Sequence, residues 1–101
     1  MATSDVRAPA NRFDEDADWI VRQMFSEADL ARSPEEYAAR HAHEWGCFSY
    51  HRYRYRDPAL GVWIRRLGEI LSSEGEIERC RQRFLTAEEL GDVRRQVAEG
   101  F

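Results

Sequence analysis

Residues 57–71 read DPALGVWIRRLGEIL, and their apolar side chains recur at intervals of three and four residues. Asp57 followed by Pro58 is typical of a helix start, because aspartate caps free backbone N–H groups and proline suits the first helical position. The stripe predicts a helix that is buried on one face. Its members are Leu60, Trp63, Ile64, Leu67, Ile70 and Leu71. We therefore expect this helix to be the centre of the core.

A second helix is predicted directly before the middle of the chain. Ser33, Pro34 and Glu36 combine a capping box with a proline start. They predict a helix from about Pro34 to Trp45, with Gly46 as its stop. This is the strongest helix boundary in the sequence.

Three further helices are expected near Asp14, Ser73 and Thr86, where a cap residue precedes an apolar stripe. Glu76 and Glu89 complete the capping boxes of the last two. The three stripes consist of Ala17, Ile20, Val21, Met24, Phe25 and Ala28, then Ile77, Cys80 and Phe84, then Leu90, Val93 and Val97. Trp19 is expected to join the core with Ile20, Met24, Phe25, Phe84, Leu90 and Val93.

The expected fold class is therefore all-α, a small bundle of about five short amphipathic helices. Residues 47–56 are expected to be either helical or an irregular segment, and the alternative is a strand that pairs between subunits. Residues 1–12 are expected to form a flexible N-terminal tail, with residues 13–101 as a single helical domain. Gly61 and Gly68 lie inside the central helix, which indicates either the close approach of another helix, within the chain or across a dimer, or a chance occurrence of glycine.

Composition excludes several classes of protein. The chain has 101 residues, and its longest apolar runs are three residues, such as Trp19 to Val21, which is far too short to cross a bilayer. The first eleven residues lack the apolar region of a secretory signal. Only Cys47 and Cys80 are present, so no disulfide framework is predicted and a cytoplasmic location is the simplest expectation. We expect neither a cofactor nor contact with a membrane.

Positive charge is concentrated in the middle of the chain. The net charge is −4, yet residues 47–66 carry five arginines and one acidic residue, and residues 50–56 read YHRYRYR. Arginine and tyrosine in alternation suit single-stranded nucleic acid, because guanidinium groups pair with phosphates and tyrosine rings stack on bases. The same residue types anchor protein interfaces. A third possibility is that the arginines pair with the acidic helices of the chain itself.

Of the two binding interpretations, a protein partner is preferred over nucleic acid, since an acidic remainder with a pI near 5.4 repels a polyanion. The sequence predicts a non-enzymatic protein that binds a protein partner or itself, as a regulator, inhibitor or small subunit. RNA or single-stranded DNA binding through the same residues is the alternative. The predicted contact residues are Tyr50, His51, Arg52, Tyr53, Arg54, Tyr55, Arg56, Arg65 and Arg66.

One weak metal pattern is present. His43, Cys47 and His51 follow one another at intervals of four residues, and imidazole and thiolate are good zinc ligands. They share one side only if the helix continues through Gly46. Cys47 beside His43 also resembles a nucleophile with its base, but no motif supplies an oxyanion site. We therefore expect no metal site and no catalytic centre.

Overall fold

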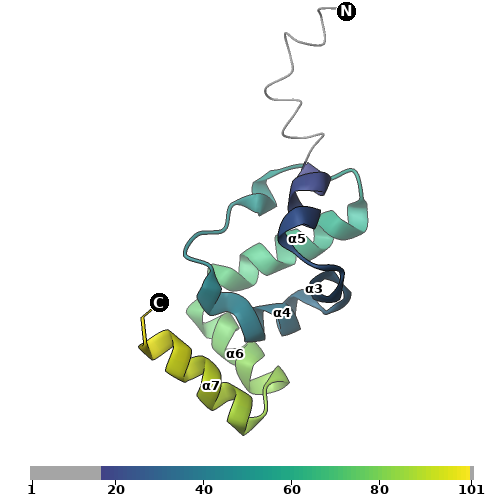
Figure 1. The fold of residues 1–101 in the computed structure, drawn as a ribbon. Helices are drawn as coiled ribbons and strands as arrows, with labels where there is room; N and C mark the ends of the chain where they lie inside the picture. Colours follow the sequence, from purple (N-terminus) through teal and green to yellow (C-terminus); the bar gives the residue numbers. More distant parts are fainter. Residues whose placement is uncertain (1–16, 101) are drawn as a thin grey trace, which may run out of the picture.

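Helices account for the regular structure of residues 17–100, which are the residues that the computed structural model describes (Figure 1). The predicted all-α class is confirmed, because this part of the chain contains no strand. The predicted tail over residues 1–12 and the cap at Asp14 lie outside the described residues. After a helix over residues 17–24 come α3 (Glu27–Ala31), α4 (Pro34–His41), η1 (Ala42–Glu44), η2 (Tyr50–Arg52), α5 (Pro58–Leu71), α6 (Glu74–Phe84) and α7 (Ala87–Ala98).

The predicted helix starts agree with the caps that the structure shows. Asp57 accepts hydrogen bonds from the backbone N–H groups of Ala59 and Leu60 at the start of α5. Thr86 and Glu89 form the full capping box of α7, in which each side chain accepts from the backbone of the other. These caps satisfy N–H groups that a helix leaves free at its first turn. Local sequence is therefore sufficient to begin both helices.

The first predicted helix had an apolar stripe that ran to Ala28. In the structure this helix ends at residue 24, before Phe25, and α3 begins at Glu27. Ser26 caps α3: its Oγ accepts from the Asp29 N–H at 3.0 Å, and the Asp29 carboxylate accepts from the Ser26 N–H at 3.1 Å. The break leaves Phe25 2% exposed, whereas Met24 is 41% exposed and Trp19 is 65% exposed. The assignment of Trp19 and Met24 to the core was therefore wrong.

The core lies where α4, α5 and α6 meet. Ile64 and Leu67 of α5 are fully buried, as predicted from the stripe. The Trp63 ring packs edge-on against Phe25 with a centroid distance of 5.3 Å, and its Nε1–H donates to the Arg32 carbonyl at 2.8 Å. This hydrogen bond satisfies the indole polar atom, so the ring can be half-buried at the edge of the core.

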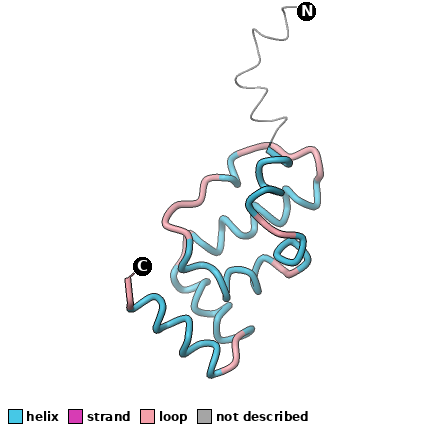
Figure 2. The backbone as a smooth tube through the Cα atoms, viewed as in Figure 1, coloured by secondary structure: helices cyan, strands magenta, loops and turns pink. Residues whose placement is uncertain are grey.

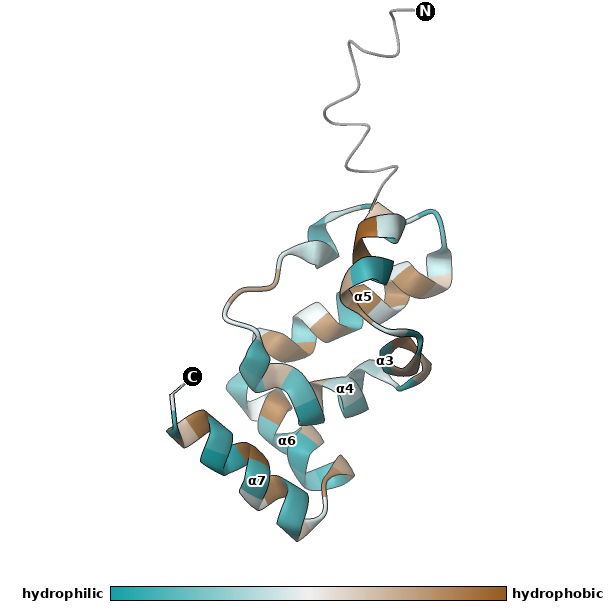
Figure 3. Ribbon diagram, viewed as in Figure 1, coloured by the Kyte–Doolittle hydropathy of each residue, from teal (hydrophilic) through white to brown (hydrophobic). Residues whose placement is uncertain are grey.

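Helix α7 lies at one end of the molecule, beyond α6 (Figure 1). Val93 is its buried side chain, and Figure 3 shows a mostly hydrophilic helix with a few hydrophobic positions. Polar contacts join it to the rest: Arg40 of α4 pairs with Glu89 at 2.9 Å, and Arg94 pairs with Glu78 of α6. The attachment of α7 therefore depends more on polar contacts than that of α5.

Candidate partner-binding surface

Residues 47–56, called the basic segment below, are irregular apart from the single turn η2. The basic segment runs along α5 (Figure 2). The irregular form is one of the two expected for residues 47–56. Helix α4 ends at His41 and η1 at Glu44, so the chain leaves helical geometry before Gly46. The segment that follows is then free to cross the surface of α5.

Gly68 and Gly61 mark where the segment crosses α5. A Cβ atom on Gly68 would lie 3.0 Å from the Cβ and ring atoms of His51, and one on Gly61 would lie 3.4 Å from the Cβ of Tyr55. A side chain at position 68 would therefore press against the segment. The element that approaches these glycines is this segment, and not the packed helix that the sequence predicted.

The tyrosines of the segment are half-buried and hold it in place. The Tyr55 hydroxyl donates to the Tyr50 carbonyl at 2.5 Å, which closes a loop around η2. Burial, together with the nearby negative charge of Asp18, raises the pKa of Tyr55 well above its usual value, so the phenol keeps its proton. The Tyr50 ring meets Phe48 and Tyr53 edge-on, with centroid distances of 5.5 and 6.0 Å.

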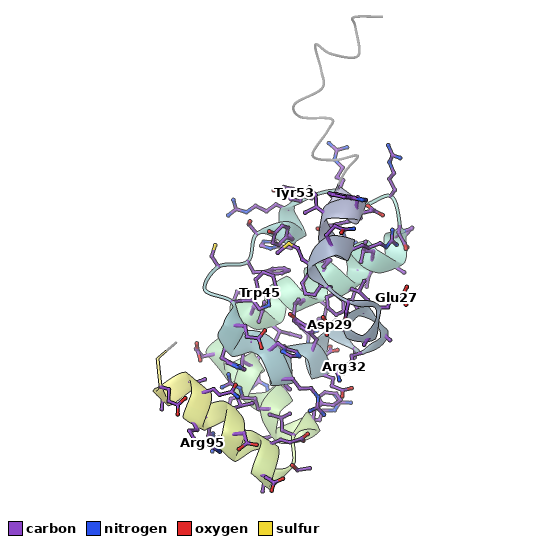
Figure 4. All side chains as sticks on the ribbon, viewed as in Figure 1. Glu27, Asp29, Arg32, Trp45, Tyr53 and Arg95 are labelled. Atoms are coloured by element: carbon purple, nitrogen blue, oxygen red, sulfur yellow. The ribbon has the colours of Figure 1, made fainter. Side chains whose placement is uncertain are left out.

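Aromatic contacts continue from the segment into the core, because the Tyr50 ring meets both Tyr53 and Trp45, which are labelled in Figure 4. Trp45 stacks on Phe25 with centroids 5.6 Å apart, and its Nε1–H donates to the Tyr37 hydroxyl at 3.0 Å. Phe48 packs edge-on against Trp45 at 5.2 Å. Trp45 and Phe48 were not among the predicted site residues, although their place beside the basic run was an available signal.

A buried carboxylate fixes the far end of the segment. Asp18 accepts hydrogen bonds from the consecutive N–H groups of Arg56 and Asp57, at 2.9 and 3.0 Å. Arg22 pairs with Asp57 at 2.8 Å and joins the same two elements. Asp18 lies almost forty residues from its partners, so no local sequence pattern indicates this contact.

The arginines of the segment point outward. Arg52, Arg54 and Arg56 are exposed, as is Arg65 on the neighbouring face of α5. Within residues 17–100, no carboxylate lies in ion-pair distance of Arg52, Arg56 or Arg65, whereas most arginines of the other helices have one. The paired arginines are Arg22, Arg32, Arg40, Arg66, Arg79, Arg81, Arg94 and Arg95.

Arg66 has a different environment from Arg65. Its guanidinium lies 2.8 Å from Glu35 of α4, 3.1 Å from Glu69 and 3.6 Å from Glu76 of α6. The hydrogen bond with Glu35 raises the pKa of Arg66, and the same bond lowers the pKa of Glu35. Arg66 therefore joins three helices, and its guanidinium is occupied by carboxylates of the chain itself.

A groove of about 380 Å³ opens between the start of the segment and the second half of α5. Its lining includes the apolar side chains of Trp45, Phe48 and Leu71, together with His51. Arg65 and Glu69 also line it, together with the exposed thiol of Cys47. The volume is at the lower end of the range typical of ligand pockets, roughly 300–1,000 Å³.

The three residues of the metal pattern lie in different elements. His43 is in η1, and its Nε2 lies 2.8 Å from Oε1 of Gln96. Cys47 is exposed in the loop, and His51 packs against Gly68. Across residues 17–100, no group of three or more His, Cys, Asp or Glu side chains is arranged to hold a metal ion.

None of the helices described is both long enough and apolar enough to cross a membrane. The scan against protein-family models found no match to this chain, nor did the searches of curated proteins and of solved structures. Function is therefore inferred from the residues and geometry of this surface alone.

Proposed function

We propose that this chain is a non-enzymatic protein that binds a protein partner through Arg52, Arg56 and Arg65, as a regulator, inhibitor or small subunit. The contrast in arginine pairing carries the proposal. These three guanidinium groups are exposed without a carboxylate partner among the described residues, in a chain of net charge −4. Arginine is among the residues that most often anchor protein interfaces, because its planar group binds carboxylates with two parallel hydrogen bonds.

The half-buried tyrosines favour a protein over a nucleic acid. Stacking on bases requires open ring faces. Tyr50 is instead half-buried and makes T-shaped contacts with Trp45, Phe48 and Tyr53, and Tyr55 is half-buried and hydrogen-bonded to the Tyr50 backbone. Binding of RNA or single-stranded DNA remains the alternative function, supported by the same exposed arginines.

We place the protein in a reducing cytoplasm. Cys47 is exposed and Cys80 is buried, and neither forms a disulfide. Burial raises the pKa of the Cys80 thiol, which keeps it protonated and unreactive. These properties are typical of cysteines that do not serve as structural bridges.

Affinity purification from the native host, with and without nuclease, tests the proposal. Wild type is compared with the triple variant R52A/R56A/R65A and with R79A/R83A/R95A, which removes the same charge from exposed positions of α6 and α7. Mass spectrometry should find a partner with the wild type and the control, and lose it with R52A/R56A/R65A. Circular dichroism should show equal helicity in all three proteins.

Two outcomes would contradict the proposal. Retention of the partner by R52A/R56A/R65A would remove these arginines from the contact. Loss of all captured protein after nuclease treatment, with nucleic acid in the untreated sample, would favour the alternative function.

A further inference from the structure

We propose that the groove beside the basic surface, which is the surface formed by Arg52, Arg56 and Arg65, is an anchor site. It would bind one large apolar side chain of an acidic segment in the partner. The groove is the one lined by Trp45, Phe48, His51, Arg65 and Leu71. The inference rests on the proposed function and names the chemistry of the partner. It follows from the size of the groove, the charge at its edge and the rigidity of its walls.

The size and walls of the groove suit a single apolar side chain. Its volume is about 380 Å³, and its lining includes the rings of Trp45 and Phe48 and the side chain of Leu71. A large aromatic side chain buries about 150–250 Å² and gives the central anchor of many interfaces. The groove is open to solvent, so a side chain of a partner can reach its walls.

The charge around the groove selects an acidic neighbour for that side chain. Arg65 lies at the rim without an ion-pair partner among the described residues, and Arg52 is exposed on η2 next to His51. The acidic residue at the rim, Glu69, is already 3.1 Å from Arg66. The unpaired charge at the rim is therefore positive, and carboxylates flanking the apolar anchor meet it with complementary charge.

The side chains that line the groove are fixed by contacts within the chain itself. Trp45 is fixed by its stack on Phe25 and its hydrogen bond to Tyr37. His51 stacks on Phe48, with rings 12° from parallel, and lies against the backbone at Gly68. A preformed site reduces the entropy lost on binding, which strengthens a small contact.

Three synthetic nine-residue peptides test the inference with the full chain. The first is acidic with one central phenylalanine, the second has alanine in its place, and the third keeps phenylalanine but has glutamine for every acidic residue. Fluorescence anisotropy of fluorescein-labelled peptides should give a Kd at least tenfold lower for the first than for either of the others. Nonauridine, labelled in the same way, should bind more weakly than the first peptide.

Cys47 provides an independent block of the groove. Alkylation with a bulky maleimide places a large group on the groove lining, while the buried Cys80 is protected. The modified protein should bind the first peptide at least tenfold more weakly. The matched control is the Cys47→Ser variant treated with the same reagent, which should bind as untreated wild type does.

Each other outcome has a distinct meaning. Equal binding of the phenylalanine and alanine peptides, unchanged by alkylation, would overturn the anchor site and leave the charged surface of the proposed function standing. Binding of none of the peptides would overturn the inference, while the capture experiment with R52A/R56A/R65A would still decide the proposed function. Tighter binding of nonauridine than of the first peptide would overturn both.

Discussion

At the scale of single residues, the absence of a side chain at Gly68 allows the basic segment to pack closely against α5 at His51. Glycine inside a helix costs roughly 0.5–1 kcal/mol relative to alanine. At Gly68 that cost is offset by the contact with His51, whose Cβ lies 3.0 Å from the place of a Cβ atom. Apart from the adjacent backbone of α7 itself, no atom lies within 4 Å of the place of a Cβ on Gly91, so no neighbouring element requires glycine there.

The two glycines therefore predict opposite responses to one substitution. Gly91→Ala should raise the free energy of unfolding by about 0.5–1 kcal/mol, because alanine favours the helix and meets open space. Gly68→Ala should be at least ~1 kcal/mol less stable than Gly91→Ala, because the segment at His51 must move. Urea denaturation followed by circular dichroism measures both. Equal gains from the two substitutions would show that His51 does not need Gly68.

At the scale of elements, Arg66 of α5 joins α4 and α6 through ion pairs with Glu35 and Glu76. The hydrogen bond from Arg66 holds the pKa of Glu35 below its ordinary value. Glu35 is the second residue of α4, directly after Pro34, and Glu88 occupies the same position in α7, after Ala87. The two glutamates thus share a helix position and differ in the ion pair.

Glu35→Gln should reduce the fall in the free energy of unfolding as the pH is lowered. A carboxylate with a lowered folded pKa stabilises the protein above its unfolded pKa, and this stability is lost as the pH falls through the folded pKa. Wild type should therefore lose stability from about pH 5 downward, and Glu35→Gln should lose less, by up to roughly 1 kcal/mol for this partly exposed pair. Thermal unfolding from pH 3 to 7 measures the difference. Glu88→Gln is the matched control, and an equal effect there would attribute the change to helix position alone.

The helix starts were the part of the fold that the sequence predicted best. Pro34, Pro58, Thr86 and Glu89 act within one turn, so their effect is visible in a short stretch of sequence. The break at Ser26 was missed because aspartate, rather than glutamate, completes its capping box. The caps thus specify where helices begin and say little about which face of a helix finds a partner.

The candidate site was predictable in part. The exposed arginines and half-buried tyrosines alternate in the sequence, so the segment itself was recognisable from residues 50–56. Contacts that depend on distant residues were not: Asp18 reaches Arg56, and Glu35 engages Arg66. The exposure of Met24 could not be predicted either, because the stripe of a helix does not show how much of it a short neighbouring helix covers, whereas Trp19 lies outside the stripe and its exposure agrees with the spacing.

At the scale of the whole molecule, stability is unevenly distributed. The centre combines the fully buried Ile64 and Leu67 with the aromatic cluster around Phe25. The end formed by α7 buries Val93 and is joined to α4 and α6 through Arg40 and Arg94. Segments with few buried apolar contacts open at low free energy, without unfolding of the rest.

Amide hydrogen exchange should therefore distinguish α7 from α5. The backbone N–H groups of α7 should exchange faster than those in the middle of α5, as measured by mass spectrometry of peptic fragments. Raising the salt concentration to 1 M should accelerate exchange in α7 more than in α5, because salt screens the ion pairs of Arg40 and Arg94. Equal protection of the two helices at both salt concentrations would contradict this view.

The position of Trp45 gives the protein an internal optical reporter. Its indole forms a wall of the groove and also stacks on Phe25, so its fluorescence depends on both surroundings. Trp19, whose indole is in water, contributes a background that an ionic quencher such as iodide suppresses. Emission that resists the quencher therefore comes mainly from the partly buried Trp45 and Trp63. An occupant of the groove should shift the emission wavelength of Trp45, so its binding can be followed without an added dye.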